Sequence, residues 1–200
     1  MGRSRNFTGN DTTTLLVLYN ELFSGKSNSF DNIAYSILGI LYIAVPFSLV
    51  NYLITFPMNA LKELHSPLIL LGIFIIIWTN DSFAYVTGSL FGKHKLYPSI
   101  SPKKSWEGTI GGGFFAIAIS VLLSYQFKIL YTYEWIILAV LTVIFGNIGD
   151  LIESQLKRMV KVKDSGNWLP GHGGALDRFD SIIFATPFVL TYLFFVKKLI

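Results

Sequence analysis

Long apolar runs separated by short polar segments make up most of this chain. An α-helix needs about 20 apolar residues to cross the hydrocarbon core of a bilayer. Pro46 lies inside the first such run, where it is expected to kink a helix. The pattern predicts an all-α integral membrane protein, a polytopic bundle of about five transmembrane helices. The expected spans are Ile33–Phe56, Ser66–Gly88, Thr109–Phe127, Glu134–Glu153 and Ser181–Val196.

The composition agrees with this class. Only 14% of the 200 residues are charged, whereas soluble domains carry roughly 25%. The chain has no cysteine, which excludes disulfides, thiolate nucleophiles and zinc–cysteine sites. We find no repeat or soluble-domain linker and expect a single membrane domain, 1–200, that begins with a polar segment, 1–32. That segment lacks the pattern of a cleavable signal peptide.

The positive charges are distributed unevenly between the two sides of the predicted bundle. The loops after the second and fourth spans are basic, and they share one side with the N-terminal segment because two spans separate them. The opposite side receives only four of the 16 Lys and Arg residues, namely Lys62, Lys128, Lys197 and Lys198. The positive-inside rule then places the two basic loops in the cytoplasm.

Carboxylates occur where a bilayer disfavours them, which usually marks a function or a specific partner. Asn80 and Asp81 lie in the second span. Asn147, Asp150 and Ser154 share one helical face at the end of the fourth. Asp177 and Asp180 share a face before the fifth, and a loop that folds back would bring Asp177 to Asp150. Such hard oxygen ligands suit Mg²⁺, although each carboxylate alone could instead pair with a nearby lysine or arginine.

The loop between the fourth and fifth spans is basic and rich in glycine. Lys157, Arg158, Lys161 and Lys163 open it, and His172 lies among Gly171, Gly173 and Gly174. Glycine N–H groups can form an anion-binding nest, and the N-terminus of the following helix also favours an anion. Basic groups, a glycine turn, a helix start and flanking carboxylates together indicate a site for polyphosphate and metal.

This segment resembles the signature of the phosphatidate cytidylyltransferase (CDP-diglyceride synthase) family. The blocks Trp78–Tyr85 and Ser101–Gly108 are similar to two further family blocks, so the resemblance covers about residues 75–195. Ala175 and Ser82 depart from the commonest residues at their positions. Members usually carry further N-terminal membrane helices, and we expect 66–196 to be the catalytic helices and loops. The matching signature residues are Ser154, Lys157, Arg158, Lys163, Asp164, Gly166, Pro170, Gly171, His172, Gly173, Gly174, Asp177, Arg178 and Asp180.

The resemblance implies transfer of a cytidylyl group from CTP to phosphatidic acid, giving CDP-diacylglycerol and pyrophosphate. It implies Mg²⁺ and leaves open a second, monovalent cation such as K⁺. We assign Asp150 and Asp177 as the metal ligands, with Ser154 as a candidate third oxygen. The expected location is the bacterial inner membrane, with no nucleic acid partner. The candidate catalytic residues are Asp150, Asp177, Lys157, Arg158, His172 and Arg178. The candidate substrate-binding residues are Ser154, Lys163, Asp164, Gly173, Gly174, Asp180, Asn80, Asp81, Lys103 and Lys104.

Other interpretations stay open at this stage. Lys103 and Lys104 could bind lipid phosphate or merely attract anionic lipid. A CTP-dependent lipid-alcohol kinase would also combine membrane helices with a nucleotide site, but it would release CDP. An ion-coupled transporter would explain the intramembrane carboxylates, though not the basic glycine loop. The small residues Gly108 and Gly111–Gly113 allow either a homodimer or close packing within one chain.

Overall fold

The structure is a computed structural model that describes residues 16, 19–23, 28–54, 66–166 and 174–198. It divides into two units, Met1–Val45 and Pro46–Ile200. Within the described residues, five helices are long and apolar enough to cross a membrane. The expected polytopic all-α membrane fold is therefore confirmed, with one small β-hairpin added to it.

The first unit contains α2 (Ser29–Gly39) and the π-helical turn η1 (Ile40–Ala44), and α3 (Val45–Ile54) continues the same helical run. Proline lacks a backbone N–H and crowds the preceding turn. A widened π turn directly before Pro46 accommodates this disturbance without ending the helix. The first predicted span thus forms one helical segment, Ser29–Ile54, which begins four residues earlier than expected.

The second unit contains the other four long helices. They are α4 (Ser66–Phe91), α5 (Trp106–Phe127), α6 (Thr132–Met159) and α7 (Leu176–Lys198). Local capping explains why two of them begin earlier than the apolar runs suggested. Ser105 accepts a hydrogen bond from the Gly108 amide (3.2 Å) at the start of α5. Glu134 accepts one from the Tyr131 amide (2.7 Å) at the start of α6.

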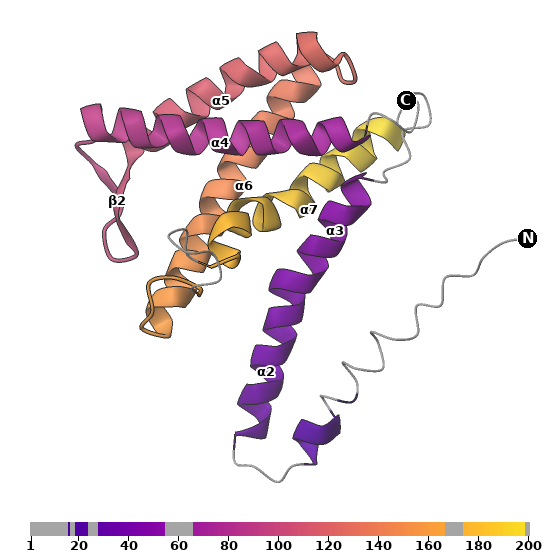
Figure 1. Ribbon diagram of the computed structural model, residues 1–200, viewed down its shortest axis with the longest axis vertical. Helices are drawn as coiled ribbons and strands as arrows, with labels where there is room; N and C mark the ends of the chain where they lie inside the picture. Colours follow the sequence, from indigo (N-terminus) through magenta and orange to yellow (C-terminus); the bar gives the residue numbers. More distant parts are fainter. Residues whose placement is uncertain (1–15, 17–18, 24–27, 55–65, 167–173, 199–200) are drawn as a thin grey trace, which may run out of the picture. The chain divides into compact units, whose positions relative to one another are not determined.

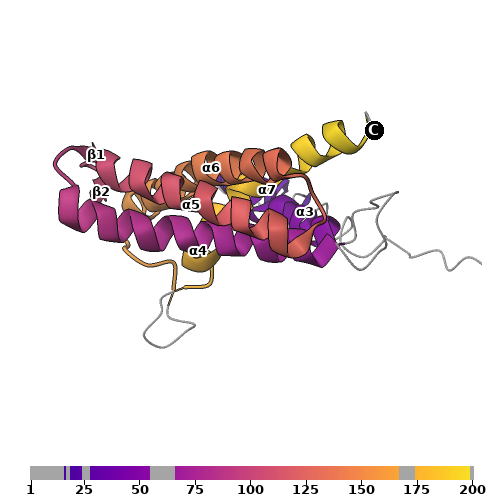
Figure 2. The same cartoon turned by 90° about the horizontal axis from the view of Figure 1, so that it is seen from above.

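Helices α4 and α5 lie side by side in both views (Figures 1 and 2). Glycines of α5 make this close approach possible. A Cβ at Gly108 would lie 2.7 Å from the Ala84 carbonyl oxygen, and one at Gly112 would lie 2.5 Å from that of Asn80. The sequence allowed these glycines either a role in a homodimer or packing within one chain, and the structure shows them packed within the chain, where Gly112 lies against Asn80 of α4.

Helices α6 and α7 form the second closely packed pair. A Cβ at Gly149 would lie 2.6 Å from Phe184 Cβ and 2.7 Å from the Asp180 carbonyl oxygen. This approach brings the backbones of α6 and α7 together beside Asp150 and Asp180. Below it, a continuous apolar core joins the helices. Its fully buried side chains include Ile69, Ile73, Ile76, Trp135, Leu138, Ile182, Val189 and Leu193.

The connection between α4 and α5, which was expected only as a basic loop, contains an antiparallel hairpin. Strand β1 (Lys95–Tyr97) pairs with β2 (Ser101–Ser105), and Lys95 lies opposite Ser105. The base of the hairpin is closed by the Trp106 amide, which donates to the His94 carbonyl oxygen (2.9 Å). The hairpin stands at the shared end of α4 and α5 (Figure 1) and carries Lys103 and Lys104.

Candidate active site

Three carboxylates from α6 and α7 form the centre of the site. Asp150 and Glu153 are three residues apart and share a face of α6, and Asp180 faces them from α7. Oxygens of these three side chains lie within 4.8 Å of one another. The close approach of the helices at Gly149 explains the short separation. We call Asp150, Glu153 and Asp180 the acidic cluster.

A fourth carboxylate reaches the same region from α4. Asp81 interacts electrostatically with Asp150 and with Lys104, and with Asp180 of the acidic cluster. Asn80, buried at 5% exposure, donates from Nδ2 to Asp81 Oδ1 (3.1 Å). Three helices, α4, α6 and α7, thus direct carboxylates at one place. The sequence had singled out Asp81, Asp150 and Asp180 individually as polar residues where a bilayer disfavours them.

Two lysines balance part of this negative charge. Lys104 Nζ of the hairpin forms an ion pair with Asp150 Oδ2. Lys157 Nζ lies 2.7 Å from Glu153 Oε2 and 2.6 Å from Asp177 Oδ1. Paired charges of this kind are the form in which ionisable side chains are tolerated inside a membrane protein. The arrangement also connects the hairpin, the end of α6 and the start of α7.

The acidic cluster suits a hard divalent cation. Oxygens that share one Mg²⁺ lie about 3–4 Å apart, because each is about 2.1 Å from the ion. The 4.8 Å limit of the cluster is close to that separation. Glu153 is 1% exposed, and among the described residues its Oε1 is a buried oxygen without a hydrogen-bond partner. A buried, unsatisfied carboxylate oxygen is costly, and a bound cation would satisfy it.

Asp177 was expected to bind a metal together with Asp150, but the structure gives its carboxylate other partners. Its Oδ2 accepts hydrogen bonds from the Ser165 amide (3.0 Å), the Ser165 hydroxyl (2.9 Å) and the Gly174 amide (2.8 Å). Its Oδ1 pairs with Lys157. Glu153 and Asp180, not Asp177, accompany Asp150 in the acidic cluster. Asp177 therefore closes the α6–α7 connection, and metal ligation by it stays a prediction.

The remaining candidate residues fall into three groups. Ser154 donates to Asp150 Oδ1 (3.2 Å), in agreement with their predicted shared face. Arg158 donates to the Val162 carbonyl oxygen (3.3 Å) at the end of α6 and is exposed. Lys103, Lys163 and Asp164 are also exposed. The structure does not describe His172 or Gly173, so their predicted roles lie outside the described residues.

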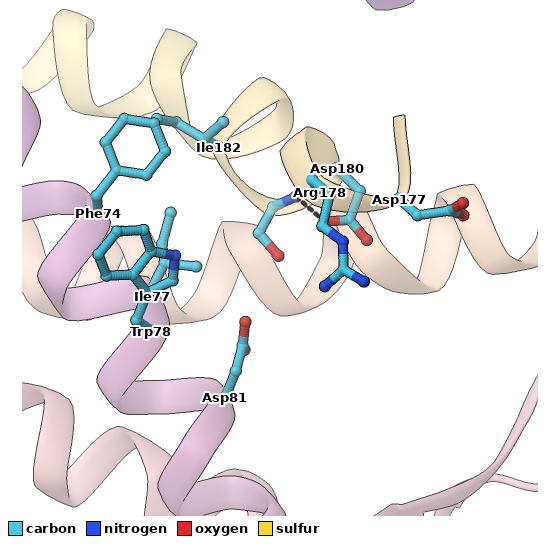
Figure 3. A pocket seen from close by; sticks show the side chains of 9 residues that line it. Phe74, Ile77, Trp78, Asp81, Asp177, Arg178, Asp180 and Ile182 are labelled. Carbon is cyan, nitrogen blue, oxygen red and sulfur yellow. Dashed lines mark hydrogen bonds between the residues drawn. The ribbon is translucent and has the colours of Figure 1, made fainter. Parts of the chain in front are cut away.

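A cavity of about 110 Å³ lies between α4 and α7 beside the acidic cluster. Its polar end carries Arg178, whose side chain extends toward Asp81 in Figure 3, while Asp177 points away from Asp81. Its other end is apolar. The apolar lining residues are Phe74, Ile77, Trp78 and Ile182. The cavity thus joins a charged region to an apolar wall within the span of α4.

Sequence reasoning missed two contributors. Glu153 lies three residues after Asp150 in an apolar helix, and this spacing is a signal that could have assigned it to the same face. Ser165 carried no such signal, because its two hydrogen bonds to Asp177 depend on how the α6–α7 connection folds. Glu153 is itself a member of the acidic cluster, whereas Ser165 acts through Asp177, which the sequence had already singled out.

The fold and the site define a class: a polytopic membrane protein in which carboxylates with metal-compatible spacing and basic side chains meet at one end of the helices. The profile of the cytidylyltransferase family matches residues 8–196, and the chain belongs to that family. The resemblance found in the sequence is thereby confirmed.

Curated relatives agree with this membership. The chain is 39% identical over 176 residues to a phosphatidate cytidylyltransferase of Staphylococcus aureus (strain COL), covering 87% of the chain and 64% of the relative. It is 41% identical over 177 residues to one of Bacillus subtilis (strain 168), covering 88% and 63%. The chain thus spans less than two thirds of the length of these relatives.

Proposed function

We propose that this chain carries the catalytic centre of a phosphatidate cytidylyltransferase, which transfers the cytidylyl group of CTP to phosphatidic acid. Family membership and relatives of that name support the proposal. The structural observation that carries it is the juxtaposition of the acidic cluster with Arg178 and an apolar wall. A reaction between a water-soluble nucleotide and a membrane lipid requires such a boundary between charged and apolar surroundings.

The chemistry asks for positioning and charge compensation more than for a base. A phosphate oxygen of the lipid attacks the α-phosphorus of CTP, and the bond to the bridging oxygen of the β-phosphate breaks. Pyrophosphate leaves with that electron pair. The lipid phosphate is already anionic near neutral pH, so no proton must be removed. The obstacle is the approach of two anions, which fixed cationic groups lower by electrostatic stabilisation.

The described residues divide this task. Asp150, Glu153 and Asp180 would hold Mg²⁺, which supplies charge neutralisation to the phosphates when bound. Arg178, at the polar end of the cavity, offers the planar donor group suited to phosphate. Asp81 and Asn80, which belong to α4, continue the polar surface of the site onto that helix. Phe74 and Trp78 place an apolar wall where the glycerol and acyl parts of the lipid would lie.

We further propose that the site faces the cytoplasm of a bacterial inner membrane. The ion pair between Lys104 and Asp150 supports a common end of the bundle for the hairpin and the end of α6. Both carry lysines that the positive-inside rule assigns to the cytoplasm. Lys128 ends α5 at the opposite connection. CTP is a cytoplasmic solute, which agrees with this orientation.

The experiment follows both products after mixing the protein in detergent micelles with Mg²⁺, α-³²P-CTP and phosphatidic acid. Labelled lipid together with stoichiometric pyrophosphate supports the proposal. Release of labelled CDP without labelled lipid would instead indicate transfer of the γ-phosphate to a hydroxyl, as in a lipid-alcohol kinase. Diacylglycerol in place of phosphatidic acid is the matched control, since it lacks the attacking phosphate and is expected to yield no labelled lipid.

A further inference from the structure

We propose that Lys104 and the divalent cation exchange on Asp150, so that the lysine is the resident counter-ion of this carboxylate and leaves it when the cation binds. The inference rests on the proposed function, because it takes the acidic cluster as the metal site. It assigns to Lys104 a positioning role that its neighbour Lys103 does not share.

The contacts of Asp150 make the two cations competitors. Asp150 Oδ1 accepts a hydrogen bond from Ser154 Oγ (3.2 Å), and Oδ2 pairs with Lys104 Nζ. Asp150 is also one of the three carboxylates whose oxygens lie within 4.8 Å of one another. A divalent ion held there would lie next to the Lys104 ammonium, and like charges repel strongly at such a separation. The metal and the lysine therefore exclude each other from Asp150.

The hairpin holds the backbone of Lys104 in place while its side chain can move. Ser105, the next residue, is 3% exposed and caps α5. Glu107 Oε2 accepts hydrogen bonds from the amides of Lys93 and His94 (both 3.2 Å) at the base of the hairpin. The side chain of Lys104 keeps 25% exposure. Rotation of its four-carbon stem thus moves the ammonium off Asp150 without displacing the strand.

The other lysine of the site lacks the same freedom. Lys157 is held by two carboxylates, and only Glu153 belongs to the acidic cluster. If a cation draws Glu153 away, Asp177 still holds Lys157 in place. Lys104 forms an ion pair only with Asp150 among the described residues, and Asp81 attracts it without such a contact. The exchange is therefore specific to Lys104, which once released carries its charge toward the phosphates that arrive with the metal.

The first test measures Mn²⁺ binding by electron paramagnetic resonance, with Mn²⁺ as the probe, in the purified full chain and three variants. Lys104→Met is expected to bind Mn²⁺ several-fold more tightly. The gain reaches about tenfold if Lys104 occupies Asp150 nine-tenths of the time. Lys103→Met removes the same charge one residue away, from an exposed side chain, and is expected to leave the affinity unchanged. Asp150→Asn is expected to abolish binding.

The outcomes separate the two proposals. If Lys104→Met binds Mn²⁺ as tightly as the parent or more weakly, and Asp150→Asn does not bind it, the exchange is overturned. The metal site is then still supported. An equal gain in both lysine variants also overturns it, since general charge removal would then suffice. Absence of Mn²⁺ binding by the parent protein overturns the metal site and the exchange together.

A second measurement needs no substitution and therefore does not depend on the variants folding. An amine-acylating reagent is applied to the parent protein with and without Mg²⁺, and the modification of each lysine is followed by mass spectrometry. Mg²⁺ is expected to accelerate acylation of Lys104 at least about threefold relative to Lys103, because a lysine freed from its ion pair is more accessible. An unchanged ratio between the two lysines contradicts the exchange.

Discussion

Glu153 and Asp177 hold the same ammonium group: Lys157 Nζ lies 2.7 Å from an oxygen of the first and 2.6 Å from an oxygen of the second. The two carboxylates belong to different helices, so Lys157 joins the end of α6 to the start of α7. Asp177 has further donors in Ser165 and Gly174, whereas Glu153 is almost fully buried. The two partners therefore depend on Lys157 to different degrees.

Replacing Lys157 with methionine is expected to destabilise the protein by about 3–5 kcal/mol, because it leaves the Glu153 carboxylate buried without its cation. Denaturant unfolding in detergent would measure the loss. The double variant Lys157→Met/Glu153→Gln is expected to recover much of the stability but none of the lost activity. Lys95→Met, on an exposed hairpin residue, is the control. If the double variant loses as much free energy of unfolding as the two single variants together, Glu153 and Lys157 are not coupled.

The close approach of α6 and α7 predicts a strong effect of one methyl group. Gly149→Ala would force a Cβ against Phe184 Cβ and the Asp180 carbonyl oxygen, so we expect a destabilisation of about 1–3 kcal/mol and weaker Mn²⁺ binding as Asp180 moves away from Asp150. Gly113→Ala makes the matched change where the nearest atom, Val143 Cγ1, is 3.5 Å away. That variant is expected to be neutral or slightly more stable. Equal effects at both positions would contradict the packing argument.

Asp180 provides a direct test of which carboxylates hold the cation. Because it belongs to the acidic cluster, Asp180→Asn is expected to weaken Mn²⁺ binding and to lower activity by about 100-fold or more. The conservative replacement keeps the volume and removes only the charge. Asp31→Asn, on an exposed carboxylate of α2, is the control for a generic change of charge. Wild-type Mn²⁺ affinity in Asp180→Asn would remove α7 from the metal site.

Glu107 is expected to govern the rigidity of the hairpin. Its carboxylate accepts from the amides of Lys93 and His94, and its Oε1 lies 2.6 Å from His94 Nδ1. Glu107→Gln should speed hydrogen exchange at these two amides by about tenfold while leaving α6 amides protected. We expect activity to fall modestly, since Lys104 would be less well positioned. Unchanged exchange at Lys93 and His94 would show that the hairpin base is held by other contacts.

Much of the fold could be predicted because membrane spans have a strong one-dimensional signal. The apolar runs predicted the five helices, and the intramembrane polar residues singled out Asp81, Asp150 and Asp180 individually, although Asp177 was the expected neighbour of Asp150. Helix ends were less accessible. Capping by Ser105 and by Glu134 starts α5 and α6 before the apolar residues begin, and hydropathy alone does not detect such caps.

The partners of individual charges could not be read from the sequence. Asp177 and Asp180 share a helical face by spacing, yet one joins Lys157 and the other faces Asp150. Which partner each carboxylate finds depends on the approach of α6 to α7 at Gly149 and on the path of the chain through Ser165. Lys104 is directed at Asp150 because it lies on the paired strand β2, and the short polar sequence of this strand did not predict the pairing. These are tertiary effects that periodicity does not encode.

The central claim is that this chain uses its acidic cluster to transfer a cytidylyl group from CTP to phosphatidic acid. The most direct measurement compares Mg²⁺-dependent formation of pyrophosphate and CDP-lipid by the parent protein and by Asp150→Asn in the same micelles. We predict both products in equal amounts from the parent and a loss of at least about 100-fold in the variant, which remains folded. A folded parent that forms neither product, or a variant as active as the parent, would contradict the account.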